Sequence, residues 1–531
     1  MQADLDRFNS RRSTVLSTEG MVATSQPLAA QAGLEILKAG GNAFDAAVAT
    51  AAALNVVEPT STGIGGDVFA CYRTADGELG ALNASGPSGQ RATLERVREQ
   101  VGGDEPEMPL RGGLTVTVPG AARGWEWTLE NHGTLGFDEV LEPAIRYATT
   151  GYPVSEIIAS NWQSGDELFQ TPHARAAYLT DDRPPHAGEL MTLDRLGASL
   201  EVVADEGADA IYEGHLGEAI VEEVQREGGL LELDDLSDFE PERVEPVSSS
   251  FRDATVYELP PNTQGMIVLE ALSIAEAAGL DPGSFGTAEY DHRLIEATKL
   301  AFHDGHRHLT DPRFDPPPAL LDDKHITERA SRIEDDSVLE AELLESIAEE
   351  ADTVLLCTAD AEGNLVTYIN SRFAGFGSGL VAGDTGIALQ NRGASFSLDP
   401  DHANRMAPGK RPFHTLIPAM AELGDGSWLS FGVMGGFMQP QGHIQVITNL
   451  IDGQMTLQAA LDAPRWRHYA DGTLGIEARY GEHIVSRLAR RGHDLGIRLP
   501  VHFGGAQAIS QRDGIIAGAT EPRKDGAAVG Y

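Results

Sequence analysis

The sequence predicts an α+β protein, and three observations support that fold class. Residues 27–39 place apolar side chains at helical spacing before a pair of glycines, which predicts an amphipathic helix. Residues 354–357 and 365–369 are two apolar, β-branched blocks around a turn that contains Gly363, which predicts a β-hairpin. After residue 353 the chain is rich in such strand-like blocks. These patterns alone do not tell how the helices and strands are layered.

The other elements are expected from the same signals, taken in chain order. Strands are expected at residues 21–25, 68–73 and 255–259. Helices are expected at residues 42–57, 121–131, 137–149, 211–227, 264–278, 288–309, 457–463 and 482–491. The helix at 42–57 is small and apolar on most sides, which predicts that it is buried. Glycines at 63, 65 and 66 predict a tight turn that lets the backbone approach a functional site.

The composition predicts a folded protein with an acidic surface. The chain has 531 residues, of which 41% are hydrophobic, so it can bury a substantial core as one large unit or as several domains. Its formal net charge of −42 disfavours binding to nucleic acid and to anionic membranes. The acidic residues are spread over many segments. A solvated surface adapted to a salty cytoplasm is therefore the simplest interpretation, because salt screens the repulsion.

Neither cysteine nor histidine forms a strong metal pattern. Cys71 and Cys357 lie in apolar blocks, which predicts buried thiols rather than a disulfide or a metal site. His303, His306 and His308 follow an H-x-x-H-x-H spacing that is weak as a metal signal, so solvated or capping histidines are expected. We expect no metal and no cofactor.

The sequence also bears on location. Residues 1–12 lack the apolar core of a signal peptide, and no run of 18 apolar residues predicts a transmembrane helix. We therefore expect a cytoplasmic protein.

Thr353 is the first candidate catalytic residue. It begins the predicted hairpin directly after residues 334–352, which hold nine carboxylates and no basic residue and predict a solvated acidic tail. Cleavage of the Asp352–Thr353 bond would leave an N-terminal threonine. Its α-amino group, with a pKa of roughly 7.7–8.0, can take the proton of its own hydroxyl, so no other base is required. A structural threonine in a strand is the alternative.

Sequence blocks along nearly the whole chain carry a resemblance to a known family. Around Thr353 they are D-T-V-L-L-C, E-G-N, F-G-S-G and A-L-Q-N, the last at residues 388–391. The others are G-G-N-A-F-D-A-A-V-A (40–49), E-P-T-S-T-G-I-G-G-D (58–67), V-P-G-A-A-R-G-W (118–125), P-P-N-T-Q-G (260–265), E-A-T-K-L-A-F-H-D (296–304), G-K-R-P (409–412) and G-V-M-G-G (432–436). In content and order they resemble the gamma-glutamyltranspeptidases, N-terminal-nucleophile hydrolases, and most closely the members without a secretion signal.

The resemblance implies a fold, a maturation and a catalytic set. It implies an αββα sandwich made by residues 1–352 as a large subunit and 353–531 as a small subunit, which remain together as one folded heterodimer. Thr353 would be the nucleophile of self-cleavage and of turnover. Ser371, 18 residues later, would bond its amine. Gly435 and Gly436 would form the oxyanion hole, where backbone N–H groups must approach a developing negative charge.

The substrate-binding positions depart from the best-known members. The family's arginine for the α-carboxylate falls in residues 82–87, which include Asn83 but no arginine. The acid for the α-amine corresponds to Ser395, and the asparagine beside it to Phe373. The paired serines correspond to His414 and Thr415. Arg392 is a replacement contact for a carboxylate or a member of a surface ion pair.

Three functions follow, and the sequence leaves them open. The preferred one is hydrolysis or transfer of γ-glutamyl groups through an acyl-enzyme. The second is an acylase or amidohydrolase of the same fold for another carboxylate-bearing amide, which the missing arginine and acid favour. The third is an unprocessed paralogue that only binds ligands. Residues 397–412 are too short for the lid loop of some members, so an open site is expected.

Overall fold

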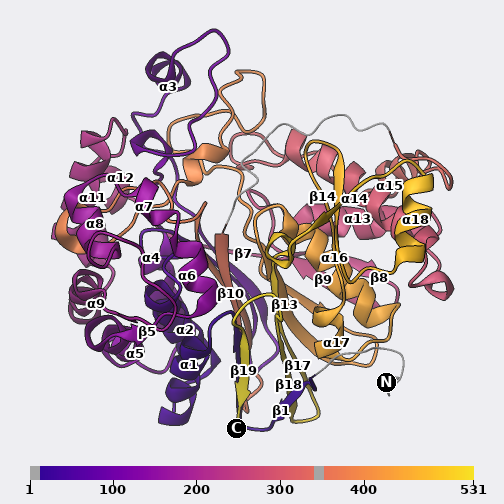
Figure 1. Ribbon diagram of the computed structural model, residues 1–531, viewed down its shortest axis with the longest axis horizontal. Helices are drawn as coiled ribbons and strands as arrows, with labels where there is room; N and C mark the ends of the chain where they lie inside the picture. The colour runs from indigo at the N-terminus through magenta and orange to yellow at the C-terminus, as the bar shows by residue number, and fades with distance from the viewer. Residues whose placement is uncertain (1–11, 340–351) are drawn as a thin grey trace.

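Two seven-stranded antiparallel sheets lie face to face at the centre of the molecule, and helices cover their outer sides (Figure 1). The computed structural model describes residues 12–339 and 352–531. The first sheet contains, in order, β19 (Ala527–Gly530), β2 (Gly20–Thr24), β10 (Asp352–Asp360), β11 (Leu365–Phe373), β3 (Asp67–Arg73), β4 (Leu79–Ala84) and β7 (Glu242–Val244). The second contains β1 (Val15–Ser17), β18 (Ile515–Thr520), β17 (Gly505–Arg512), β13 (Trp428–Met434), β12 (Ala419–Glu422), β9 (Ala254–Glu258) and β8 (Val247–Phe251). The predicted αββα sandwich is confirmed.

The helices form two separate layers. Against the first sheet lie α1 (Pro27–Ala39), α2 (Ala43–Val57) and α4 (Ala121–His132), with α5 (Phe137–Thr150) packed on α2. Against the second lie α13 (Gly265–Ala277) and α16 (Met438–Ile451), with α14 (Ala288–His308) packed on α13. Every residue of α2 is buried, as its all-round apolar character predicts.

Further α-helices and two small sheets lie outside these layers. The remaining helices are α3 (Leu94–Val101), α6 (Glu156–Trp162), α7 (Gly165–Leu168), α8 (Pro172–Tyr178), α9 (Asp194–Glu206), α10 (Asp209–Tyr212), α11 (His215–Arg226), α12 (Leu233–Ser237), α15 (Asp323–Ala330), α17 (Leu457–Asp462) and α18 (Glu482–Arg490). Two small sheets contain β5 (Tyr152–Pro153) with β6 (Leu190–Met191), and β14 (Trp466–His468), β15 (Thr473–Glu477) and β16 (Asp494–Arg498). The single helix expected at 211–227 is wrong. Gly214 caps α11 in an extended conformation, so the chain forms α10 and α11 instead.

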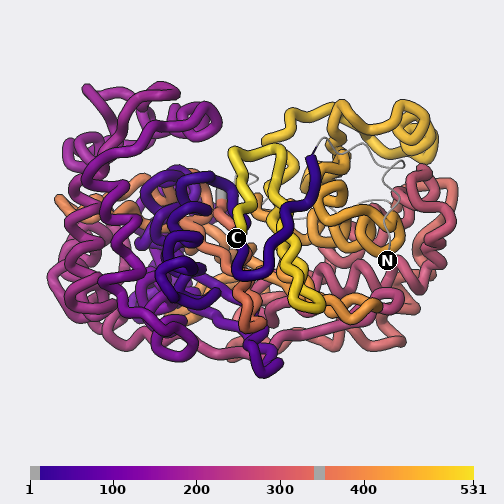
Figure 2. Tube along the Cα trace, turned by 90° about the horizontal axis from the view of Figure 1, so that it is seen from below, coloured from indigo at the N-terminus to yellow at the C-terminus, as the bar shows by residue number. Residues whose placement is uncertain are grey.

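Each sheet contains strands from both sides of residue 353. In the first sheet β10 pairs with β2 on one side and with β11 on the other, and β11 pairs with β3. Strands near the two ends of the described chain also pair, β1 with β18 and β2 with β19 (Figure 2). Neither part of the chain can therefore complete a sheet alone.

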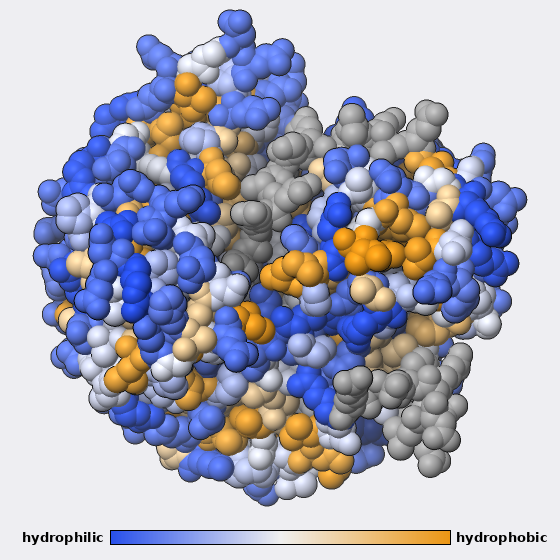
Figure 3. Space-filling view, viewed as in Figure 1, coloured by the Kyte–Doolittle hydropathy of each residue, from blue (hydrophilic) through white to orange (hydrophobic). Residues whose placement is uncertain are grey.

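The alternation of side chains along β10 links two cores. Val354 and Leu356 point to the core shared with α2, whereas Leu355 and Cys357 point to the core between the sheets. Both cysteines are buried and free, as expected. None of the described helices is long and apolar enough to cross a membrane. Hydrophilic residues cover most of the face in Figure 3, with separate apolar patches between them.

Candidate active site

Thr353 lies at the beginning of β10, where the pairing with β11 is irregular. Asp352 pairs with Phe373 and Val354 with Asn370, so the register shifts across Thr353. Thr353 is 1% exposed, and its Oγ1 donates to Ser371 Oγ at 3.2 Å. Ser371 Oγ also accepts the N–H of Phe373 at 2.9 Å. The structure therefore brings the predicted nucleophile and the predicted hydroxyl partner into contact.

The alternation of the hairpin explains why these two side chains meet. Thr353 precedes Val354, so it shares the inter-sheet side with Leu355, and Ser371 shares that side with Ile369 on β11. Gly66 packs behind them, because a Cβ there would lie 2.3 Å from the carbonyl oxygen of Ser371. The glycine-rich turn thus approaches the candidate site, as expected from the sequence.

Gly435 and Gly436 follow β13 and precede α16. Their φ angles are 117° and 57°, both in the left-handed region that favours glycine. A Cβ on Gly435 would lie 3.1 Å from Gly504 Cα. Within the described residues, neither backbone N–H has an acceptor, whereas the Gly436 carbonyl accepts Gln264 Nε2 at 3.0 Å. Two free N–H groups on a pinned loop are what an oxyanion hole requires.

Arg392 is a fully buried cation with unused donors. Its Nη1 donates to Thr415 Oγ1 at 2.9 Å, and its guanidinium lies 4.3 Å from the centre of the Phe373 ring. Its Nε and Nη2 are buried without a partner. Burial lowers the pKa of Arg392 to about 9, and the charge of Asp67 partly opposes that shift, so the side chain stays charged at pH 7. The alternative of a surface ion pair is wrong, because the side chain is inaccessible to solvent.

Asp67 and His414 form a buried pair beside Arg392. His414 Nε2 donates to Asp67 Oδ2 at 3.1 Å, and its Nδ1 accepts the N–H of Leu416 at 3.2 Å, so this imidazole is a neutral tautomer. Burial lowers the pKa of His414 well below its usual value and raises the pKa of Asp67 to about 7. Asp67 Oδ1 accepts Gln390 Nε2 at 3.0 Å and the N–H of Gly86 at 3.1 Å.

The side chains of Asn83 and Ser395 form hydrogen bonds within the protein that stabilise the site. Asn83 Nδ2 donates to Asn262 Oδ1 at 2.9 Å, and its Oδ1 accepts Ser85 Oγ at 2.7 Å, which ties β4 to the turn before α13. Ser395 Oγ donates to the carbonyl of Arg392 at 2.9 Å and so closes its own turn. Phe373, Arg392 and Thr415 are therefore brought together directly, and His414 joins them through Asp67.

Residues that sequence reasoning did not single out complete the site. Asp67, Gln390 and Gln264 each lie inside a block that carries the family resemblance. The blocks were thus the available signal for these residues. Which residues of a block face the site, however, depends on contacts between segments that lie far apart in the chain.

Two groups of side chains away from the hairpin could hold a metal ion. His292, Glu296 and His493 form one, and Glu270, Asp304 and His325 form the other. In the first, Lys299 pairs with Glu296 at 2.6 Å. In the second, Arg329 pairs with Asp304 and His325 donates to Glu270 at 2.8 Å. Both groups are thus balanced by their own ion pairs.

Comparison with known proteins identifies the family to which the chain is similar. The family model described as Gamma-glutamyltranspeptidase matches residues 29–531. The Glutathione hydrolase-like YwrD proenzyme of Bacillus subtilis (strain 168) is 38% identical, over 97% of this chain and 99% of that protein. The Oxamate amidohydrolase proenzyme of Klebsiella pneumoniae subsp. pneumoniae is 36% identical, over 98% of this chain and 100% of that protein.

A solved structure extends the match to three dimensions. The crystal structure of cephalosporin acylase from Bacillus halodurans has a TM-score of 0.91 and 42% sequence identity, and the match covers 99% of this chain and 98% of that one. The names of these relatives include a glutathione hydrolase-like protein, an amidohydrolase and an acylase. Fold and sequence agree, and the chain belongs to the gamma-glutamyltranspeptidase family of N-terminal-nucleophile hydrolases.

Proposed function

We propose that this protein is an N-terminal-threonine amide hydrolase that cleaves itself before Thr353 and then acts on amides whose acyl group ends in a carboxylate. One observation carries the acyl specificity. Arg392, beside the Thr353 hairpin, presents a buried positive charge with two unused N–H donors. A buried charge without a partner is costly, whereas a carboxylate accepts a guanidinium in a fork of two hydrogen bonds. An anionic acyl group would therefore complete the site.

Self-cleavage and turnover use the same hydroxyl. The Thr353 hydroxyl attacks the carbonyl carbon of Asp352, the C–N bond breaks, and the chain becomes an ester with a free α-amine. Water then hydrolyses the ester to release residues 1–352 and 353–531 as two subunits. In turnover the α-amine takes the hydroxyl proton while Oγ1 attacks the substrate amide, and then gives it to the leaving amine. Water, or a second amine, resolves the acyl-enzyme.

The N–H groups of Gly435 and Gly436 would bind the oxygen that becomes negative in each tetrahedral intermediate. Ser371 would hold the freed α-amine close to the hydroxyl, since its Oγ already lies 3.2 Å from Thr353 Oγ1. No metal is needed for these steps, because the base is part of the nucleophilic residue itself.

We place acyl groups without an α-amine, such as glutaryl, first among the substrates. The hydroxyl of Ser395 is used within its own turn, and Asp67 already accepts three donors. Neither offers a free anionic partner to an ammonium group. The names of two relatives point the same way, because oxamate carries a carboxylate next to its amide and an acylase removes an acyl group.

Hydrolysis or transfer of γ-glutamyl groups is the second candidate. Asp67 favours it, because it is a carboxylate within electrostatic range of Arg392 and its raised pKa of about 7 would fall if an ammonium group came near. The two candidates differ only in how the α-amine is held.

A panel of p-nitroanilides tests this proposal. We expect kcat/KM for the glutaryl compound to equal or exceed that for the γ-glutamyl compound, and acetyl p-nitroanilide, which lacks the carboxylate, to react far more slowly. A strong preference for γ-glutamyl would select the second candidate. Full-length protein that cleaves none of the three and runs as a single band on a denaturing gel would identify the unprocessed, ligand-binding alternative.

A further inference from the structure

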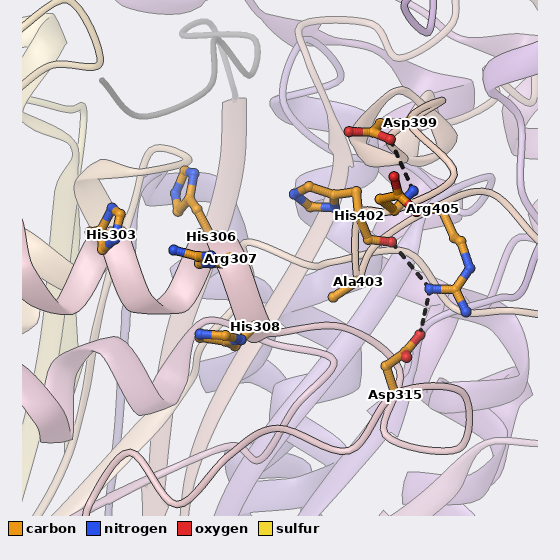
Figure 4. Close-up of a pocket in the computed structure, with 10 residues that line it drawn as sticks. His303, His306, Arg307, His308, Asp315, Asp399, His402, Ala403 and Arg405 are labelled. Carbon is orange, nitrogen blue, oxygen red and sulfur yellow. Dashed lines mark hydrogen bonds and ion pairs between the residues drawn. The ribbon is translucent and has the colours of Figure 1, made fainter. Parts of the chain in front are cut away.

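Groups of ionisable side chains lie in two different settings. One is a cavity of about 460 Å³ at the end of α14, where Arg405 donates to the carbonyl of His402 and to the carboxylate of Asp315 (Figure 4). Arg307 and Asp399 in its wall are exposed to solvent. Charges that water reaches are screened, so a change of charge in this cavity has little effect elsewhere.

The expectation of solvated or capping histidines at the end of α14 is wrong for His306. Both of its ring nitrogens are shielded from solvent, and neither has a partner among the described residues. Its ring lies 4.8 Å from that of Phe437 and 5.7 Å from that of Phe413. Burial lowers the pKa of His306 to about 4. This histidine therefore packs as an uncharged aromatic ring.

The second setting is the buried group of Asp67, His414 and Arg392. All three side chains are inaccessible to solvent. Buried charges are screened far less than exposed ones, so the charge of each member depends on the others. Arg392 carries a positive charge, an ionised Asp67 carries a negative one, and His414 is a neutral tautomer. By itself the group is therefore electrically balanced.

The ionisable side chains around Asp67 come from separate parts of the chain. Arg392 belongs to the turn at residues 392–395, and His414 to the segment before β12. Tyr212 on α10 also lies within electrostatic range, and burial raises its pKa, so it stays uncharged. The other donors to Asp67 are a side-chain amide and a backbone N–H group, which do not ionise. The charge that stabilises an ionised Asp67 is thus that of Arg392.

A substrate carboxylate would disturb this balance. It would bind the two donors of Arg392 that have no partner and would then share one guanidinium with Asp67. Two buried carboxylates beside one cation leave an uncompensated negative charge, which is costly where water cannot enter. A neighbouring carboxylate raises the pKa of an acid, and burial has already raised the pKa of Asp67 to about 7. Protonation of Asp67 removes the excess charge.

The proton would go to Asp67 rather than to His414. Nδ1 of the imidazole already accepts the N–H of Leu416 at 3.2 Å, so a second proton on the ring would break that hydrogen bond. Burial also lowers the pKa of His414 well below its usual value. A protonated Asp67 can still accept hydrogen bonds through its carboxyl group.

We propose that Asp67 is a specificity-determining residue of the acyl site, which takes up a proton from solvent when a carboxylate-bearing acyl group binds at Arg392. The inference rests on the proposed function, because it requires the substrate carboxylate at Arg392. The proton adds to a carboxylate oxygen of Asp67, no bond of the substrate changes, and the proton returns to solvent when the acyl group leaves. An acyl group that also carries an ammonium group brings its own positive charge and would need no proton. The preference for acyl groups without an α-amine is therefore greatest at neutral pH and below.

Pentanoate is the probe for this inference, because it has a carboxylate on a chain of acyl length and no amide to cleave. Titration calorimetry of wild-type protein in two buffers of different ionisation enthalpy gives the number of protons taken up per bound pentanoate. We expect roughly half a proton or more at about pH 7.5. The dissociation constant should rise by up to about tenfold per pH unit above pH 7. Measurements should end at about pH 8.5, below the pKa of about 9 of Arg392.

Two variants separate Asp67 from other buried acids. Asp67→Asn should bind pentanoate without proton uptake, and more tightly than wild-type protein at about pH 8.5, because no second carboxylate competes for Arg392. Asp291→Asn is the matched control. Burial raises the pKa of Asp291 to about 7 as well, but this residue lies on α14 and accepts Tyr480 Oη at 2.9 Å. Its variant should keep the wild-type proton uptake. The α-amine of Thr353 is common to all these proteins, so its titration cancels in the comparison.

The outcomes distinguish this inference from the function on which it rests. Pentanoate binding without proton uptake in wild-type protein would overturn the inference and leave the amide hydrolase intact, and this measurement decides even if Asp67→Asn does not fold. Weaker binding by Asp67→Asn with the wild-type pH dependence would also overturn it, since a purely structural role predicts that result. Hydrolysis gives a second measurement. The ratio of kcat/KM for glutaryl over acetyl p-nitroanilide should fall above pH 7 in wild-type protein, and a constant ratio would contradict the inference. A protein that neither binds pentanoate nor hydrolyses glutaryl p-nitroanilide would overturn both proposals.

Discussion

The proposed specificity for the acyl group depends on one side chain, that of Arg392. Its Nη1 is held by Thr415 and its plane by Phe373, so the guanidinium is oriented before any substrate arrives. Orientation in advance lowers the entropy lost on binding. A carboxylate would meet Nε and Nη2, the two donors without a partner.

Replacing Arg392 with glutamine should weaken the binding of glutaryl amides. A hydrogen bond to a charged group contributes about 1.5–3 kcal/mol, so kcat/KM should fall about 10- to 100-fold. Self-cleavage should persist, because it needs no substrate carboxylate. Kinetics on p-nitroanilides and a denaturing gel measure the two effects. Unchanged kinetics would remove Arg392 from the acyl site.

Replacing Ser395 with aspartate should shift the preference toward γ-glutamyl amides. An aspartate cannot donate to the carbonyl of Arg392, as the Ser395 hydroxyl does, so its carboxylate must turn away from that turn. It then adds an anionic partner for an ammonium group. The ratio of kcat/KM for γ-glutamyl over glutaryl p-nitroanilide should rise above the wild-type ratio. If it does not, position 395 has no role in holding the α-amine.

At the scale of elements, the site joins the ends of three strands, two from the first sheet and one from the second. β10 and β11 supply the nucleophile and its partner hydroxyl, and the turn after β13 supplies the free N–H groups. Gln264, at the start of α13, holds that turn through the carbonyls of Gly436 and Thr415. The proposed chemistry therefore depends on the stacking of the sheets.

An alanine at Gly435 should reduce kcat with a smaller effect on KM. A Cβ there requires an unfavourable left-handed conformation and approaches Gly504, so the N–H groups must move. Loss of one oxyanion donor costs about 100-fold or more in kcat. Gly426→Ala is the control, because Gly426 also has a positive φ (82°) but lies in the turn before β13, in open space. Equal losses in both variants would indicate a general effect on folding.

Cleavage before Thr353 should produce two subunits that stay associated. We expect two bands on a denaturing gel, with the smaller beginning Thr-Val-Leu-Leu, and one species under native conditions, because each sheet contains strands of both parts. Thr353→Ala should give one band, whereas Thr353→Ser, which keeps a hydroxyl, should still cleave. An active wild-type enzyme that remains full-length would contradict this maturation.

At the scale of the whole molecule, the net charge of −42 is the dominant property. Hydrophilic residues spread over the face in Figure 3. The 81 acidic residues outnumber the 39 lysines and arginines and are distributed over many segments of the sequence, so like charges repel one another. The melting temperature should rise with salt, because the Debye length falls from about 30 Å at 0.01 M to about 3 Å at 1 M. Thermal melts across that range measure the effect. A constant or falling melting temperature would count against adaptation to salt.

The sequence by itself determined the features that local pattern encodes. Alternation and turn residues placed the hairpin of Thr353 and Ser371, and the apolar period placed eight of the nine predicted helices to within a residue or two, whereas α9 and α16 were not predicted. The pattern did not predict the end of the helix at Gly214, because one glycine within a long amphipathic stretch does not by itself end a helix. The glycines at 435 and 436 were identified through the family resemblance of residues 432–436, and the structure adds positive φ angles that few other residues adopt.

Tertiary structure decided what the site can bind. Asp67 and His414 are 347 residues apart in sequence, yet they share a hydrogen bond in which burial suppresses the charge of the imidazole. The burial of Arg392 and the aromatic setting of His306 likewise depend on segments that meet only after the two sheets stack. Local sequence encodes backbone preference, whereas the charge state and free donors of a side chain depend on its surroundings in space.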